Sequence, residues 1–404
     1  MEIFILYINF FFPIFTKWTN SSTGSIFLNT LLIIFSLFCI LIRKKYLKFN
    51  QSITYINIFY FFIMTVGIIS NLSIVIIRDF YEYQRPILYI LGFLVGNIYA
   101  KRNKISKIFK NLERIFNIFI ILNIIKIVDY KNIIFSFYQR TRLMNQTRIS
   151  GTFISPYDYA YFLIFPMFLF LDRYIKTRKK KFLLKFILIF ISIVLTESRS
   201  QFLTMIFSFL IYFIIKIKFS FSLREKRFIK INIGYFIFLL IYIFINFKEK
   251  IIKKLNYLYL GLYSIFTKGI TADPSSNIRY QQVLTAINEF KIFGNGPSKI
   301  RNLFFENQYA LYLFRYGILG IIYNIILLSC LFFICYILLK KIKKYENLSQ
   351  SLIVAFSIFI FSLPIALLSN NIIDQVRISF FFYFIIGIFN NLENKNYMRE
   401  EVYR

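Results

Sequence analysis

The chain has 404 residues, of which 58% are hydrophobic and 21% aromatic, and its mean hydropathy is +0.62. This composition excludes a soluble globular domain, which would be far less apolar. The absence of histidine excludes acid–base chemistry by that side chain and disfavours a zinc site. The net charge of +32 lies largely in loops between apolar segments, as in membrane proteins, and so does not indicate a nucleic-acid partner.

Apolar segments near the length of a membrane span recur along the whole chain, and such segments cross a bilayer as helices. The first five are 3–15, which is short and contains Pro13, then 25–42, 53–77, 86–100 and 108–128. The next four are 156–171, 182–195, 202–217 and 231–247. The last three are 307–339, 352–368 and 379–389, and the first of these is long enough to be tilted or partly interfacial. The sequence therefore predicts an all-α, polytopic membrane protein with about 12 transmembrane helices.

The basic loops predict an orientation for this protein. The most basic short loops follow the second, fourth, sixth, eighth and tenth segments, which places them and both termini in the cytoplasm. Residues 1–247 then form nine helices with an outer loop at 129–155, and residues 248–305 form a large, partly helical outer loop. Residues 306–404 form the last three helices and a cytoplasmic tail.

Both outer loops carry basic residues against the positive-inside rule. The first loop holds Lys131, Arg140, Arg142 and Arg148. The second begins at 248–268 with basic and apolar residues at helical spacing, which is typical of an amphipathic helix in the membrane interface. That helix is either an anchor under anionic lipid head groups or part of a substrate site. Cationic residues on the outer side predict an anionic ligand there.

Three arginines lie apart from the cytoplasmic clusters: Arg148, Arg199 and Arg279. Guanidinium groups bind phosphate oxygens in a bidentate manner, so arginines that converge favour a pyrophosphate ligand. Plain alternatives exist, since Arg199 has Glu197 as a neighbour and Arg279 lies at the start of a helical stretch.

The join between the second loop and the tenth segment is the strongest candidate for an active site. Glu306 is the candidate general base, although a carboxylate at a helix start is also a typical capping residue. Charges within an apolar helix are costly and usually face a cavity or a partner. We expect the other polar and glycine positions of this stretch to bind substrate, namely Gly294, Gly296, Asn307, Tyr309 and Arg315.

Four short motifs follow one another between residues 148 and 328. They are Arg148-x-x-Gly151-Thr152-Phe153-x-x-Pro156, Ser198-Arg199-Ser200, Ser276-x-x-Arg279, and Gly294-x-Gly296-Pro297 leading to Glu306-Asn307-x-Tyr309 and Gly317-Ile318-Leu319-Gly320. Their order and spacing resemble the O-antigen polymerase and ligase superfamily, most closely the Wzy-type polymerases. The first half of the chain matches only in being hydrophobic.

The resemblance implies a glycosyltransferase of the bacterial inner membrane that needs no metal and no cofactor. Its substrate would be an undecaprenyl-pyrophosphate-linked repeat unit, polymerised at the periplasmic face into O-antigen or a related polysaccharide. Glu306 would act as base, while Arg199 and Arg279, with Arg148, would neutralise the departing pyrophosphate. Membrane lipid, a chain-length regulator and a flippase would be the partners.

Two other functions stay open on the sequence alone. A ligase that transfers finished glycan to lipid A–core shares nearly every feature, but ligases typically carry histidine where this chain has Glu306. A flippase or transporter for the same lipid-linked unit would place its charges within the spans and have short outer loops.

Overall fold

The computed structural model describes residues 1–14, 21–46, 51–128, 137–138, 148–219, 274–297 and 305–402, together with the single residues 263, 267, 269, 271 and 303. Within these residues every regular element is a helix, which confirms the predicted class. The predicted segment 231–247 lies outside the described residues, and so does the amphipathic stretch 248–268 apart from Tyr263 and Thr267.

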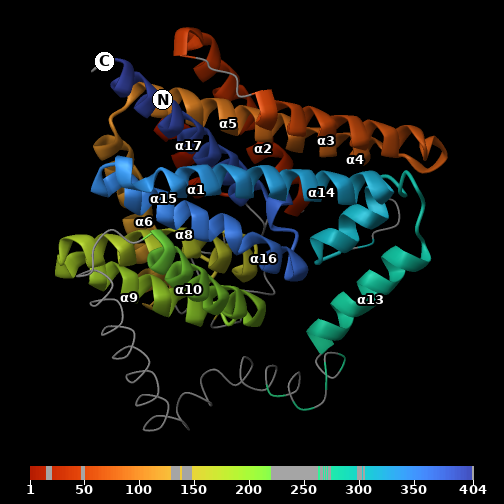
Figure 1. The fold of residues 1–404 in the computed structure, drawn as a ribbon. Coiled ribbons are helices and arrows are strands. Elements are labelled where there is room, and N and C mark those ends of the chain that lie inside the picture. The colour runs from red at the N-terminus through yellow and green to blue at the C-terminus, as the bar shows by residue number, and fades with distance from the viewer. Residues whose placement is uncertain are drawn as a thin grey trace.

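The helices lie close to the predicted segments (Figure 1). The first six are α1 (Glu2–Phe11), α2 (Ser21–Ile42), α3 (Gln51–Ile69), α4 (Ile77–Phe80), α5 (Gln84–Arg102) and α6 (Ile105–Val128). After the first loop come α8 (Pro156–Thr177), α9 (Lys180–Leu195) and α10 (Arg199–Phe219). The remaining helices are α13 (Pro274–Asn288), α14 (Gln308–Lys340), α15 (Asn347–Phe361), α16 (Leu363–Ser369) and α17 (Val376–Val402).

The number of membrane spans was predicted wrongly. Among the described residues, three helices are long and apolar enough to cross a membrane: Thr23–Ile42 of α2, α10 and α14. The bent pair α15 and α16 adds a fourth if it counts as one broken span. The other segments fall short because α1 and α9 have too few residues, while helices such as α8 carry several charged residues. The described chain is therefore a helical protein with a few helices suited to a membrane, not about twelve.

The core is built around α5 and α17, which run parallel in close contact. A Cβ on Gly96 would lie 2.0 Å from the carbonyl oxygen of Phe384, so only glycine permits this approach. Small residues allow helix backbones to meet in this way. Further along, the amide of Asn391 donates to the carbonyl oxygen of Asn97 at 2.6 Å.

The helix α14 is broken at Gly317, whose φ of 59° and ψ of −141° are not helical. We call residues 308–316 the short half of α14 and residues 318–340 its long half. The loop after α13 supplies the hydrogen bonds that the break interrupts: the amides of Asn295 and Gly296 donate to carbonyl oxygens of the short half at 2.8 and 2.9 Å. Broken helices are stable in membranes only when other protein groups satisfy the freed backbone. Figure 1 shows the short half folding back from the long half.

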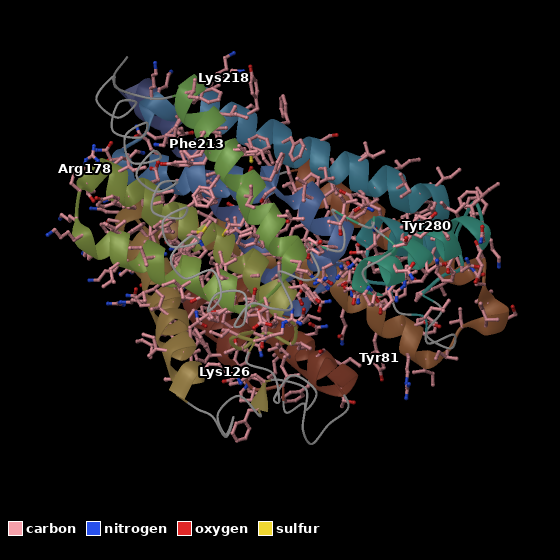
Figure 2. All side chains as sticks on the ribbon, turned by 90° about the horizontal axis from the view of Figure 1, so that it is seen from below. Tyr81, Lys126, Arg178, Phe213, Lys218 and Tyr280 are labelled. Carbon is pink, nitrogen blue, oxygen red and sulfur yellow. The ribbon has the colours of Figure 1, made fainter. Side chains whose placement is uncertain are left out.

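The bundle has two chemically different ends. The helices α8, α10 and α14 end in basic residues, at Lys176, at Lys216 and Lys218, and at Lys340. Figure 2 shows Arg178 and Lys218 at one end of the bundle and Tyr280 of α13 at the other. The same three helices start near Asp158, Arg199 and Glu306, so two of the predicted site residues, Arg199 and Glu306, lie at the end away from the basic clusters.

Candidate functional site

Glu306 lies immediately before α14, held in place on both sides. The side-chain oxygen of Asn307 accepts from the amide of Ala310 at 3.0 Å, which caps the helix. The amide of Glu306 itself donates to Oε1 of Gln282 on α13 at 2.8 Å. These contacts fix the backbone at Glu306 and do not involve its side chain. The side chain is 28% exposed and can make other contacts.

Arg279 forms an ion pair with Glu306, with 2.7 Å between Nη2 and Oε2. Arg279 lies on α13, in the second turn of that helix, and its side chain is 15% exposed. The predicted base and one predicted pyrophosphate-binding arginine thus meet in the structure. The arginine holds the carboxylate in one orientation, and such charge-assisted bonds are the strong ones.

The ring of Tyr157 joins two of the predicted arginines. The guanidinium carbon of Arg148 lies 5.3 Å from the centre of this ring, and that of Arg279 lies 5.6 Å from it. Both distances are typical of cation–π contacts. Residues 131 positions apart in the chain are therefore brought to one aromatic side chain, and two positive charges face the same space.

Arg148 also binds the turn between α9 and α10. Its Nε donates to the carbonyl oxygen of Thr196 at 2.9 Å, and its Nη2 donates to that of Glu197 at 3.4 Å. Glu197 has a φ of 51°, and this left-handed residue turns the chain into α10. Arg199 is the first residue of α10, two positions further on, so the third predicted arginine lies next to the turn that Arg148 holds.

Several polar groups at the start of α10 are buried without hydrogen-bond partners among the described residues. They are the hydroxyls of Ser198 and Ser200 and the Oε1 of Gln201. The Nε2 of Gln201 donates to the hydroxyl of Ser369 at the end of α16. A helix start with free polar groups and a nearby arginine is suited to an anion.

Asp158 is a functional candidate that the sequence analysis missed. It lies in the first turn of α8, next to Tyr157, and is 2% exposed. Its Oδ1 accepts from the Nδ2 of Asn370, which follows α16, at 2.5 Å. The only signal in the sequence is an acidic residue two positions after Pro156, and an acidic residue in a first helical turn is ordinary.

We define the Glu306 site as Arg148, Tyr157, Asp158, Arg279, Glu306 and Asn370. Beside it lies a shallow groove of about 250 Å³ between α13 and the chain before α14. The groove is lined by amide, hydroxyl and apolar side chains, from Asn277, Ile278, Gln281, Gln282, Thr285, Leu303 and Phe305. Gln282 belongs to both the groove and the contact with Glu306, so the two are continuous.

Two residues predicted to bind substrate, Asn307 and Tyr309, have structural partners. Asn307 is the cap of α14, as described above. The hydroxyl of Tyr309 donates to the carbonyl oxygen of Pro364 at 3.2 Å, which ties the short half of α14 to α16. Both residues position Glu306 through the backbone that follows it.

The turn that contains Gly294 and Gly296 packs against α14 next to its break. Both glycines have positive φ, at 75° and 65°. A Cβ on Gly294 would lie 2.2 Å from the carbonyl oxygen of Arg315, so the turn packs directly on the helix backbone. These glycines therefore shape the helix that carries Asn307 and Tyr309.

Arg315 belongs to a separate buried network and not to the Glu306 site. Its Nη1 lies 3.5 Å from Oε2 of Glu82, which also pairs with Arg85 at 2.5 Å. Arg85 in turn pairs with Asp374 at 3.0 Å, and the hydroxyls of Tyr89 and Tyr312 donate to Asp374. We call these two arginines and two carboxylates the buried quartet. Residues 78–85, which the sequence presents as a charge-balanced loop, supply half of it.

The remaining predicted cations of the first loop, Lys131, Arg140 and Arg142, lie outside the described residues. Among the residues that are described, no three His, Cys, Asp or Glu side chains gather closely enough to hold a metal ion. The described site thus offers paired charges, two carboxyl groups and hydrogen-bond donors.

This arrangement suits a reaction in which a hydroxyl proton is removed and a negative charge develops nearby. Glu306 can accept a proton, and Arg279 and Arg148 can stabilise an anion. Comparison of the chain with protein-family models, with curated proteins and with solved structures finds no match in any of the three.

Proposed function

We propose that this chain is a glycosyltransferase of the bacterial inner membrane, with both termini in the cytoplasm, that polymerises undecaprenyl-pyrophosphate-linked repeat units at the periplasmic face. The observation that carries the proposal is the contact of Arg148 and Arg279 with the ring of Tyr157, together with the ion pair between Arg279 and Glu306. These are residues of the motifs on which the family resemblance rests.

In this proposal Glu306 removes the proton of the acceptor hydroxyl, and Arg279 orients its carboxylate. Arg148, together with Arg199 at the start of α10, binds the pyrophosphate of the donor. The free polar groups at the start of α10 support this assignment, because a helix N-terminus favours a negative charge. The groove next to Glu306, with amide side chains among its apolar lining, would take the acceptor sugar.

The position of the basic clusters supports a periplasmic site. The clusters at the ends of α8, α10 and α14 lie at the opposite end of the bundle from the Glu306 site. The positive-inside rule would put those clusters in the cytoplasm and the site on the other side. A flippase that delivers the repeat unit and a regulator of chain length are the partners that this reaction needs, and no nucleic acid takes part.

A transporter for the same lipid-linked unit is the second candidate, and one observation favours it. The buried quartet places two arginines and two carboxylates inside the helix bundle, as transport proteins often do. Its charges balance, however, and its members contact one another, so it offers no unpaired group to a passing substrate.

Deletion of the gene in its own bacterium tests the proposal directly. We expect the ladder of long glycolipids on a gel to be replaced by a single capped repeat unit. Loss of all capped species, with long polymer left on the lipid carrier, would instead identify a ligase. Loss of all capped species with no polymer on the carrier would favour the transporter, which would have failed to deliver the repeat unit. An unchanged ladder would contradict all three functions.

A double-mutant cycle tests the pair within the site. We expect Glu306→Gln and Arg279→Gln each to lower the rate of polymer formation by roughly 100-fold, and the double variant to be little worse than either. Non-additivity is expected because the arginine acts through the carboxylate it holds. Tyr280→Phe, an exposed neighbour of Arg279 on α13, is the matched control and should retain the rate.

A further inference from the structure

The two carboxyl groups of the Glu306 site have very different surroundings. Glu306 is partly exposed and paired with Arg279. Asp158 is buried, accepts from the neutral amide of Asn370, and forms no ion pair with any described lysine or arginine. Sites with two carboxyl groups in unequal surroundings commonly use one as base and the other as acid.

Burial without a cation favours the neutral form of Asp158. A carboxylate removed from water needs a positive partner or several hydrogen bonds, and otherwise it holds its proton. Asp158 has one such bond, to Oδ1, and its Oδ2 accepts none from the described residues. A protonated carboxyl would have an O–H to donate into the site.

Charged residues lie on several of the elements around Asp158. Glu306 precedes α14, and Arg279 lies on α13. Arg148 precedes α8, Glu197 lies in the turn between α9 and α10, and Arg199 begins α10. The helices α15 and α16 contain no titratable side chain. Burial raises the pKa of the Asp158 carboxyl well above its usual range, the Asn370 amide opposes that shift, and the Glu306 charge adds to it.

We propose that Asp158 is the proton donor that works opposite Glu306 in the same reaction. This inference rests on the proposed transfer of a glycan from pyrophosphate. Asp158 gives its proton to the oxygen that leaves the sugar, while Glu306 takes the proton of the attacking hydroxyl.

The step balances in atoms and electrons. A bond forms between the acceptor oxygen and the anomeric carbon, and the bond from that carbon to the pyrophosphate oxygen breaks. The bonding electron pair leaves with this oxygen, which takes the proton of Asp158. Glu306, now protonated, returns its proton to water, and Asp158 regains one from water, so the site is ready for the next repeat unit.

The first experiment compares Asp158→Asn with wild type in the purified full chain, using lipid-linked repeat unit extracted from the deletion strain as donor and acceptor. Asparagine keeps the shape and can still bond to Asn370. We expect kcat to fall by roughly 100-fold with KM unchanged. The wild-type rate should decline at high pH, where Asp158 loses its proton, and this decline should be missing in the variant.

Asp172→Asn is the matched control, since it makes the same change on the same helix. The Asp172 carboxylate lies at the basic end of α8, paired with Lys176 at 3.0 Å and with Lys216. Its loss should lower stability and leave the pH profile of the reaction unchanged. A purely structural role for Asp158 would make the two variants behave alike.

A second variant keeps the inference testable if Asp158→Asn does not fold. Asn370→Ala removes the bond that opposes the pKa shift of Asp158, so the high-pH decline should move to higher pH. An unmoved decline, or wild-type kinetics in Asp158→Asn, would overturn the role of Asp158 while the transferase stands. Wild-type protein that makes no polymer from this donor would instead overturn the proposed function.

Discussion

At the scale of single residues, α8 carries two buried aspartates whose partners give them opposite characters. Asp172 is surrounded by two lysines, which makes it part of a structural ion cluster. Asp158, about four turns earlier in the helix, has only a neutral amide. The contrast shows that residue type alone does not decide a role, because the neighbours set the cost of the charge.

The raised pKa of Asp158 predicts a pH dependence of folding. Because the folded state holds this proton more tightly than the unfolded state, stability should fall as pH rises from about 3.9, the unfolded value, towards the folded pKa. Within that window the free energy of unfolding of wild type should fall, relative to that of Asp158→Asn, by about 1.4 kcal/mol per pH unit. Thermal unfolding of both proteins in detergent, from about pH 4 to about pH 8, measures the difference. A difference that stays constant with pH would show that the carboxyl titrates normally.

At the scale of elements, the break in α14 decides where Glu306 lies. If the helix ran straight through Gly317, its start would be carried away from α16 and α13. The break is possible because Ile318 donates to the carbonyl oxygen of Ile292 at 3.1 Å, in place of a bond within the helix. A loop 25 residues upstream of Gly317 thus completes the helix.

Gly317→Ala should strain this join. The φ of 59° disfavours any side chain, and the added Cβ would lie 2.0 Å from the carbonyl oxygen of Ile292. We expect a loss of about 1–3 kcal/mol in stability and a larger fractional loss of polymer formation, because the short half of α14 positions Glu306. Ile318→Ala, at an exposed neighbouring position, is the control and should cost much less.

The order and the limits of the helices were well predicted from hydrophobic segments. The segment 156–171 is the start of α8, and 202–217 lies within α10. The break at Gly317 was not predicted, because a glycine within an apolar run is common in membrane helices. Its conformation depends on Ile292 and the turn at Gly294, and such distant contacts leave no local pattern.

At the scale of the whole molecule, the buried quartet joins α5, the short half of α14 and the chain that enters α17. The side chain of Asp374 is 1% exposed, and its charge is balanced by Arg85. Charges this deep persist only when they satisfy one another. The quartet therefore fixes the relative positions of three elements that are distant in sequence.

Arg85→Met should cost about 3–5 kcal/mol, because it leaves the carboxylate of Asp374 buried without its cation. The double variant Arg85→Met with Asp374→Asn should recover part of that loss, since the unpaired charge is gone. Unfolding of both variants by denaturant measures the two costs. Costs that simply add would show that the two residues do not act as a pair.

The site as a whole was only partly predictable. The basic residues of the two long loops pointed to Arg148 and Arg279, and the helix start pointed to Glu306. The structure brings Arg279 to Glu306 and both arginines to Tyr157. The structure assigns Arg315 to the quartet, through its contact with Glu82. The sequence did not indicate this contact, because Glu82 lies on a segment whose charges balance one another. Tyr157, Asp158 and Asn370 were missed because each is an ordinary residue at a helix end.

The contact between α1 and α17 has a consequence for how the protein is made. Arg377 donates to the carbonyl oxygens of Asn9 and Phe12, at 2.5 and 2.7 Å, and the amide of Asn9 donates back to Arg377. A helix at residues 2–11 is therefore completed by one that begins at residue 376. Until residue 377 has been synthesised, these carbonyl oxygens of α1 lack the arginine that binds them, so ribosome stalling or truncation before residue 377 should loosen α1 from the bundle.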